Sequence, residues 1–260
     1  MIDRIVFEDV TIDFKIYDIN AKSLRHALVL NKISSIMSSK ESKVGGTLLH
    51  NETGPVTIRA LSNINLRLKD GDRLAIVGHN GSGKSTLLRV AAGIYEPQIG
   101  RVKTSGRIMP LFNMMEGMSQ DATGLEIIGM RAALLGFSRN EINLKRDEIV
   151  DFCELGDYIK MPIRTYSTGM QVRLAFAITT AVKADILIMD EFIGAGDAGF
   201  FDKAQKRLKS FVDEARVLIL ATHSPDLARQ WCNKGMLLSH GNLAADGNLE
   251  DVLEEYKMSH

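Results

Sequence analysis

One short segment restricts the fold of this chain more than any other, a glycine-rich loop placed between an apolar strand and a helix. The apolar residues 74–77 lead into Gly78-His79-Asn80-Gly81-Ser82-Gly83-Lys84-Ser85-Thr86, which fits the spacing G-x-x-x-x-G-K-[ST]. Such a loop curls so that successive backbone N–H groups point inward at a phosphate, and the following helix adds its positive end. The segment predicts a phosphate-binding loop in which Lys84 reaches the β- and γ-phosphates and the Ser85 hydroxyl is placed for Mg²⁺.

The rest of the chain supplies the strands and helices that such a loop needs. Short apolar runs at 73–77, 186–189 and 217–221 predict buried strands. Helical patterns cover 83–92, 122–136, 139–154 and 169–182, and alternating runs at 4–18 and 56–68 predict further strands. Residues 19–58 show no sustained period and are expected to be an insertion or loop, with a short helix at 23–29 as an alternative. We therefore expect an α/β fold with a largely parallel sheet.

Composition excludes several classes of protein. The 260 residues carry 32 Lys+Arg and 32 Asp+Glu, so the formal net charge is zero, whereas nucleic-acid binding usually shows as a basic excess. No run approaches 18 apolar residues, and the N-terminus lacks the apolar region of a signal peptide. Cys153 and Cys232 do not have metal-ligand spacing. We expect a cytoplasmic chain that has reduced thiols and no transmembrane helix.

Acidic residues follow the second apolar run. Asp190 and Glu191 end the strand at 186–189, where two carboxylates are costly to desolvate unless a cation or donors lie nearby. Beside a phosphate loop, Asp190 is predicted to hold Mg²⁺, and Glu191 to act as general base on the attacking water. His223 follows the strand at 217–221 and is predicted to hydrogen-bond a γ-phosphate or that water. The other histidines, such as His240, have no such context and are expected on the surface.

A further segment carries a resemblance to a known family. Residues 166–173 read Tyr-Ser-Thr-Gly-Met-Gln-Val-Arg at the start of a helical pattern. With the phosphate loop, Asp190-Glu191, the Gly-Asp pair at 196–197 and His223 in this order, the chain resembles the nucleotide-binding subunit of ABC transporters from residue 5 to its end. The resemblance implies a P-loop NTPase fold of ABC type, with a RecA-like core, an antiparallel β subdomain and a helical subdomain.

The resemblance also implies a division into lobes and a dimer. It predicts one nucleotide-binding domain over 1–260, with a RecA-like and β lobe of 1–112 and 183–260 and a helical lobe of 113–182. In the family the signature segment caps the ATP of the opposite subunit, so ATP and Mg²⁺ are the expected cofactors of a head-to-tail homodimer. Ser167, Thr168 and Gly169 would then face the partner's γ-phosphate at a positive helix end, and Asp197 would lie in the loop that links the two sites.

Some positions depart from the commonest family pattern. Thr168 replaces a glycine, and Met170 replaces the signature glutamine. Most members of the family have a glutamine that contacts the metal and the nucleotide. The resemblance places Asn113 at that position, with Glu116 as the alternative. The base-stacking aromatic of the family falls on Phe14, with Tyr17 second; either ring is equally compatible with sheet core.

These departures resemble those of the polysaccharide exporters, which move O-antigen, capsule or teichoic acid chains on a lipid carrier. The expected function is ATP hydrolysis that drives a separate membrane permease for a lipid-linked glycan, from the cytoplasmic face of the inner membrane. Because the sequence ends soon after His223, no additional carbohydrate-binding domain is expected. Drug, lipid or peptide exporters and a soluble ABC switch are the rival interpretations.

Four methionines crowd into ten residues next to Asn113: Met109, Met114, Met115 and Met118. Flexible, polarizable side chains suit an adaptable interface, so they are candidates for permease contact. A Met-rich piece of helical core is the equal alternative.

Overall fold

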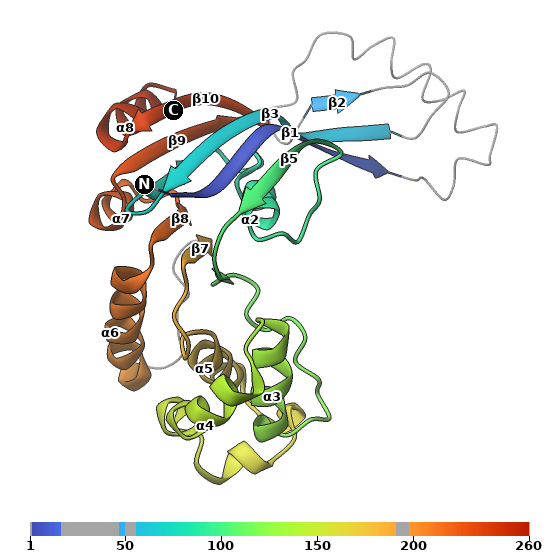
Figure 1. Cartoon of the computed structure of the whole chain (residues 1–260), viewed down its shortest axis with the longest axis vertical. Helices are drawn as coiled ribbons and strands as arrows, with labels where there is room; N and C mark the ends of the chain where they lie inside the picture. Colours follow the sequence, from blue (N-terminus) through green and yellow to red (C-terminus); the bar gives the residue numbers. More distant parts are fainter. Residues whose placement is uncertain (1, 17–46, 50–55, 191–197, 260) are drawn as a thin grey trace, which may run out of the picture.

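The computed structural model describes residues 2–16, 47–49, 56–190 and 198–259. These residues form two β-sheets, with α2 beside them, and a group of helices that lies to one side of the larger sheet (Figure 1). Among them, no helix is both long and apolar enough to cross a bilayer.

The larger sheet has six strands in the order β10-β9-β4-β8-β7-β6. Its members are β4 (Arg73–Val77), β6 (Ile108–Pro110), β7 (Ile186–Asp190), β8 (Val217–Ala221), β9 (Lys234–Ser239) and β10 (Asn242–Asn248). All neighbours pair in parallel except β9 and β10. Central parallel strands are covered on both faces, which explains their unbroken aliphatic sequences. The carboxyl ends of β4, β7 and β8 therefore meet at one edge.

The smaller sheet is antiparallel, in the order β2-β3-β1-β5. Its strands are β1 (Asp3–Ile16), β2 (Thr47–Leu49), β3 (Val56–Lys69) and β5 (Ile99–Thr104). Asp9 and Asn63 adopt positive φ where the β1–β3 register shifts. Buried side chains of β1 and β3, including Ile5, Phe7 and Leu61, pack with α2 (Lys84–Ala91) and the larger sheet in one core.

Three helices form a second body, α3 (Gly124–Leu134), α4 (Arg139–Cys153) and α5 (Thr168–Thr179). Capping boxes at Thr123–Glu126 and Ser138–Glu141 start α3 and α4, because side chains satisfy the free N–H groups of a helix start. This body shares a core with α6 (Ala198–Glu214) and one face of the larger sheet. α7 (Pro225–Trp231) and α8 (Leu249–Met258) lie beside β9 and β10 (Figure 1).

The predicted α/β fold with a largely parallel sheet is confirmed. The four helical patterns correspond to α2, α3, α4 and α5. The expectation of a loop across 19–58 is wrong at β2, which pairs with β3; the expected helix at 23–29 lies outside the described residues. The lobe boundaries near 112 and 182 stay a prediction.

Candidate functional site

The glycine-rich loop connects β4 to α2 and is packed closely on its neighbours. Gly78, Gly81 and Gly83 have φ of 150°, 82° and 108°, a region that favours glycine. A Cβ on Gly78 would lie 2.3 Å from Leu238 O, and one on Gly83 2.8 Å from Ala60 O. Two of the glycines are therefore required both by backbone conformation and by close approach to β9 and β3.

Lys84 is held inside this loop. Its side chain is buried, and Nζ donates to the carbonyl oxygens of Gly78 at 2.8 Å and His79 at 3.0 Å. These bonds hold the ammonium group within the curl of the loop. A phosphate oxygen in the loop would receive a charge-assisted hydrogen bond from it.

Ser85 and Asp190 meet although 105 residues separate them. Ser85 Oγ donates to Asp190 Oδ2 at 3.0 Å, because β4 and β7 both flank β8 and end at the same edge. No described Lys or Arg forms an ion pair with Asp190. A hydroxyl and a carboxylate are oxygen donors of the kind that Mg²⁺ prefers.

A cavity of about 240 Å³ lies over these groups. It is lined by Ala60, Asn80, Gly81, Gly83, Lys84, Ser85, Thr86, Asp190 and His223. His223 is exposed and follows β8, so three strand ends contribute to one cavity. Ala60 of β3 was not among the predicted site residues, since a small apolar residue in an alternating strand carries no chemical signal.

His79 and Ser82 belong to the loop but do not line the cavity. The His79 ring lies 4.5 Å from that of His240, centroid to centroid, and its Nδ1 donates to Asn80 O at 2.9 Å. Ser82 is buried, and its carbonyl accepts from Gly241 N at 2.9 Å. His240, which was expected on the surface, is half-buried there and packs on the loop through the His79 ring.

The two peripheral predictions, Phe14 and Asn113, are not among the residues that line the cavity. Phe14 is 37% exposed and packs edge-to-face on Tyr95 with 5.4 Å between ring centroids, so its sheet-core alternative is wrong. Tyr17 lies outside the described residues. Asn113 is exposed with φ of 53°, and its carbonyl accepts from Glu116 N at 2.9 Å. The structure does not bring Asn113 or Glu116 to the cavity lining.

The signature segment begins α5 in the separate helical body (Figure 1). Ser167 and Thr168 are exposed, and Ser167 Oγ accepts from Met170 N at 3.2 Å as the helix cap. A Cβ on Gly169 would meet only Ser167 Oγ, at 3.8 Å, so this helix end is open to an approaching group. None of the three lines the cavity.

Glu191 and Asp197, two further predicted site residues, lie outside the described residues. The sequence places Glu191 directly after Asp190, at the end of β7.

The methionine cluster belongs mostly to the core. Met109, Met114 and Met118 are 0%, 6% and 9% exposed, and all three pack in the core that the helical body shares with the sheet. The core alternative therefore holds for these three residues, and the interface alternative does not.

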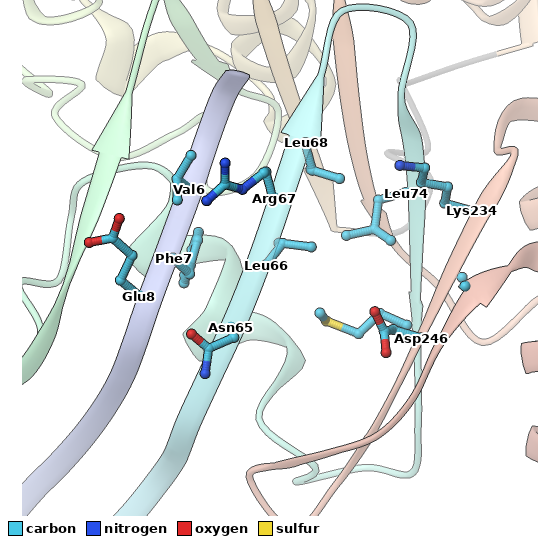
Figure 2. Close-up of a pocket in the computed structure, with 13 residues that line it drawn as sticks. Val6, Phe7, Glu8, Asn65, Leu66, Arg67, Leu68, Leu74, Lys234 and Asp246 are labelled. Carbon is cyan, nitrogen blue, oxygen red and sulfur yellow. The ribbon is translucent and has the colours of Figure 1, made fainter. Parts of the chain in front are cut away.

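A larger cavity of about 400 Å³ lies between the β1–β3 pair and the β9–β10 pair (Figure 2). Three of the four charged residues in its lining have ion-pair partners: Glu8 with Arg101, Arg67 with Asp3, and Lys234 with Asp72. No predicted site residue lines it. The candidate nucleotide site is therefore the smaller cavity, where the glycine-rich loop meets the ends of β7 and β8.

Comparisons with known proteins agree with this assignment. Residues 61–194 match the ABC transporter family. The chain is 38% identical over 237 residues to the O-antigen export system ATP-binding protein RfbE of Yersinia enterocolitica, covering 91% of this chain and 95% of that protein. It is 40% identical over 200 residues to the O-antigen export system ATP-binding protein RfbB of Myxococcus xanthus, covering 77% of this chain and 46% of that protein.

A third relative is the teichoic acids export ATP-binding protein TagH of Lactococcus lactis, 34% identical over 84% of this chain and 47% of that protein. Among solved structures, the dimeric post-hydrolysis state of the ATP-binding cassette MJ0796 bound to ADP and Pi is similar with a TM-score of 0.63 and 20% identity, covering 94% of this chain and 98% of that one. The ATP binding subunit of an ABC transporter has a TM-score of 0.66 and 18% identity, covering 98% and 94%. At this identity the likeness concerns the fold.

Proposed function

The chain belongs to the ABC transporter family, and on that premise we propose that it is the ATP-hydrolysing subunit of an exporter for a lipid-linked polysaccharide. As a member it binds ATP and is an ATPase. The observation that carries the ATPase part of the proposal is the 3.0 Å hydrogen bond between Ser85 and Asp190 at the loop cavity. A loop hydroxyl beside a strand-end carboxylate is the arrangement that a nucleoside triphosphate with Mg²⁺ requires.

The nucleotide would be held mainly by the glycine-rich loop. Backbone N–H groups and Lys84 Nζ would donate to the β- and γ-phosphates, while the oxygens of Ser85 and Asp190 would hold Mg²⁺. When bound, Mg²⁺ neutralises charge on those phosphates. Phe14 is proposed to stack on the base, with Tyr95 supporting its ring edge-to-face at 5.4 Å between centroids. Asn113 remains a proposed third contact of the γ-phosphate end.

Hydrolysis needs a base and a group that holds the γ-phosphate. Glu191 would accept a proton from the attacking water. The oxygen of that water would bond to the γ-phosphorus, and ADP would leave. His223 would donate a hydrogen bond to a γ-phosphate oxygen. Its place in the cavity lining supports this role.

The second half of each site is proposed to come from another copy of the chain. Ser167 and Thr168 are exposed at a helix start that also includes Gly169 and lies outside the cavity lining, and a helix N-terminus favours an anion. In a head-to-tail homodimer this end would face the partner's γ-phosphate, and Asp197 would lie near the contact between the two sites.

A separate permease is the proposed membrane partner, which would hold this subunit at the cytoplasmic face of the inner membrane. Its contact is better supported on α3 than at the buried methionines. Met130 and Leu134 are 46% and 73% exposed and lie one helical turn apart. Leu134 Cδ1 would be 3.1 Å from a Cβ on Gly117, so the patch adjoins the loop of Asn113.

The cargo is proposed from the relatives. The Yersinia O-antigen export protein matches over nearly its whole length, so an O-antigen-like glycan on a lipid carrier is the first candidate. Teichoic acid is the second, because the Lactococcus relative matches over a smaller share of its own length.

The catalytic assignment is tested by Glu191→Gln. Loss of the base should leave ATP binding unchanged, lower turnover by about a hundredfold or more, and trap an ATP-bound dimer. ATPase assays and size-exclusion chromatography with ATP measure both effects. Glu254→Gln, at an exposed position on α8, is the matched control and should behave as the original chain. Turnover that survives Glu191→Gln would contradict the assignment.

The partner and cargo are tested by purifying the chain with its permease from native membranes. Leu134→Ser should weaken that association, whereas Leu144→Ser, which changes a leucine with 83% exposure on α4, should not. Mass spectrometry of the copurified lipid-linked material would identify an O-antigen-like glycan or a teichoic acid. Equal loss of permease in both variants would remove the α3 patch from the proposal.

A further inference from the structure

The helix that begins with the signature segment, α5, makes side-chain contacts with the first turn of α6. α6 begins at Ala198, directly after residues 191–197, and that segment contains Glu191 and Asp197. The contacts therefore connect α5 with the first turn of α6. In the sequence this turn directly follows Glu191 and Asp197, to which the proposed function gives the catalytic base and the inter-site loop.

Phe200 is the centre of these contacts. It is 0% exposed and lies three residues after Asp197. Its ring packs edge-to-face on Phe152 of α4 at 5.4 Å and on Phe176 of α5 at 6.5 Å, centroid to centroid. The first turn of α6 is thus anchored in the helical body by one large side chain.

Arg173 of α5 covers the same ring. Its Cζ lies 4.7 Å from the Phe200 centroid, and its side chain is only 16% exposed. A guanidinium over an aromatic face is attracted by the ring quadrupole, more strongly when water is partly excluded. Arg173 lies four residues beyond Gly169, about 6 Å along the helix axis. Arg173 therefore connects the start of α5, which is proposed to face the partner's γ-phosphate, with the start of α6.

A matched contact lies further along α6 and joins the same helices. Arg207 Cζ lies 4.5 Å from the Phe152 centroid, and its side chain is 18% exposed. It also donates to Thr180 Oγ1 at 2.9 Å and to Thr180 O at 3.0 Å. Arg207 follows Phe200 by two helical turns, so it secures the packing of α6 at a distance from residues 191–197.

We propose that Arg173 is a positioning residue for ATP-driven dimerisation: through Phe200 it keeps the start of α5 in a defined position relative to the first turn of α6, which directly follows residues 191–197 in the sequence. This inference rests on the proposed function, in which both groups lie at the dimer interface around ATP. Close-packed interiors transmit small displacements, and a misplacement of about 1 Å at a reacting site costs up to a hundredfold in rate. Arg173 itself touches neither nucleotide nor water in this scheme.

The test uses the full chain with Glu191→Gln, so that ATP-bound dimers accumulate. Arg173→Met keeps the length and removes the charge; it should weaken ATP-dependent dimerisation about tenfold, because both signature helices of a symmetric dimer are then held less firmly in position. Analytical ultracentrifugation measures dimerisation, and a fluorescent ATP analogue measures binding to the monomer, which should not change. Arg173→Lys, which returns a cation to the ring, should restore most of the dimer affinity.

Arg207→Met is the control for a general loss of packing. It removes two hydrogen bonds to Thr180 and an ion pair with Glu148, so it should lower the melting temperature, yet change dimerisation by less than about twofold. Phe200→Leu should weaken dimerisation as much as Arg173→Met does, and the double variant should be no weaker than either single variant. If Arg173→Met fails to fold, dimerisation of Phe200→Leu tests the proposal in its place.

Equal weakening by Arg207→Met and Arg173→Met would overturn the inference while leaving the proposed function in place. Absence of any ATP-dependent dimer with Glu191→Gln alone would overturn the proposed function, and this inference with it.

Discussion

The two halves of the proposed ATP site, the glycine-rich loop and the signature segment, are built in opposite ways. The loop is enclosed by β3, β9 and the β9–β10 turn, and its lysine is already bonded to two loop carbonyls. The signature segment is an exposed helix start whose Ser167 cap accepts one hydrogen bond. The first half is therefore preorganised within one chain, while the second has donors but no enclosure.

This difference separates binding from turnover. A preorganised loop can bind phosphate without further rearrangement, because its donors are aligned before the ligand arrives. An open helix end has a positive potential but cannot exclude water alone. We therefore expect changes in the loop to remove ATP binding, and changes in the signature segment to affect only dimerisation and hydrolysis.

The largest effect is expected from Lys84→Met. Removal of the buried ammonium takes away a charge-assisted donor to the phosphates and leaves the carbonyls of Gly78 and His79 without it, so ATP affinity should fall by about a hundredfold or more. Isothermal titration calorimetry with ATP measures the loss. Lys183→Met, at a lysine whose side chain is 83% exposed, should leave affinity unchanged. Retained affinity in Lys84→Met would contradict the preorganised loop.

An intermediate effect is expected from Ser167→Ala. The monomer should bind ATP as before, while the turnover number falls about tenfold, because the partner's γ-phosphate loses a donor. Loss of the helix cap should also cost about 1 kcal/mol of unfolding free energy. Steady-state ATPase assays and urea denaturation measure the two effects.

Ser138→Ala is the matched control for Ser167→Ala. Ser138 caps α4 in the same helical body through Glu141 N at 3.3 Å, so its loss should cost similar stability but leave turnover unchanged. A fall in turnover in both variants would assign the effect of Ser167 to stability instead of phosphate contact.

The smallest effect concerns pH and the capping boxes of the helical body. Hydrogen bonds from Arg107 and from the Ser138 backbone and hydroxyl lower the pKa of Glu141 from 4.5 to about 2. The folded pKa is depressed, so this contribution is fully present above pH 4.5 and is lost as the pH falls from there to about 2. Hydrogen bonds from Thr123 lower the pKa of Glu126 in the same direction.

Unfolding measured by circular dichroism across this pH range should show the loss, and Glu141→Gln should reduce its size. α2 has no side-chain cap at Gly83, so no capping carboxylate makes the stability of this helix depend on pH. An unchanged pH profile in Glu141→Gln would show that the capping box contributes nothing to stability in solution.

Much of the fold followed from periodicity, because buried parallel strands and amphipathic helices have distinct local patterns. β4, β7, β8 and the helices α2 to α5 were predicted near their observed positions. β5 and β10 were missed because most of their residues are exposed and their sequences lack the apolar alternation of a half-buried strand. For the methionine cluster the sequence left two interpretations open, because residue type alone does not distinguish an adaptable interface from a core.

The sequence by itself determined the chemistry of the nucleotide site. The loop from Gly78 to Thr86 carries its backbone geometry, its lysine and its hydroxyl within nine consecutive residues, so no long-range information was needed. The acidic pair at 190–191 and His223 were likewise readable, because each directly follows an apolar strand.

Only the tertiary structure decided which of these groups meet. The 3.0 Å contact between Ser85 and Asp190 depends on the strand order β4-β8-β7, and the burial of the methionines depends on how the helical body packs on the sheet. The pairing of Arg173 with Phe200 has the same origin. Such distances arise from many weak contacts between segments far apart in the chain, and no local pattern records their sum.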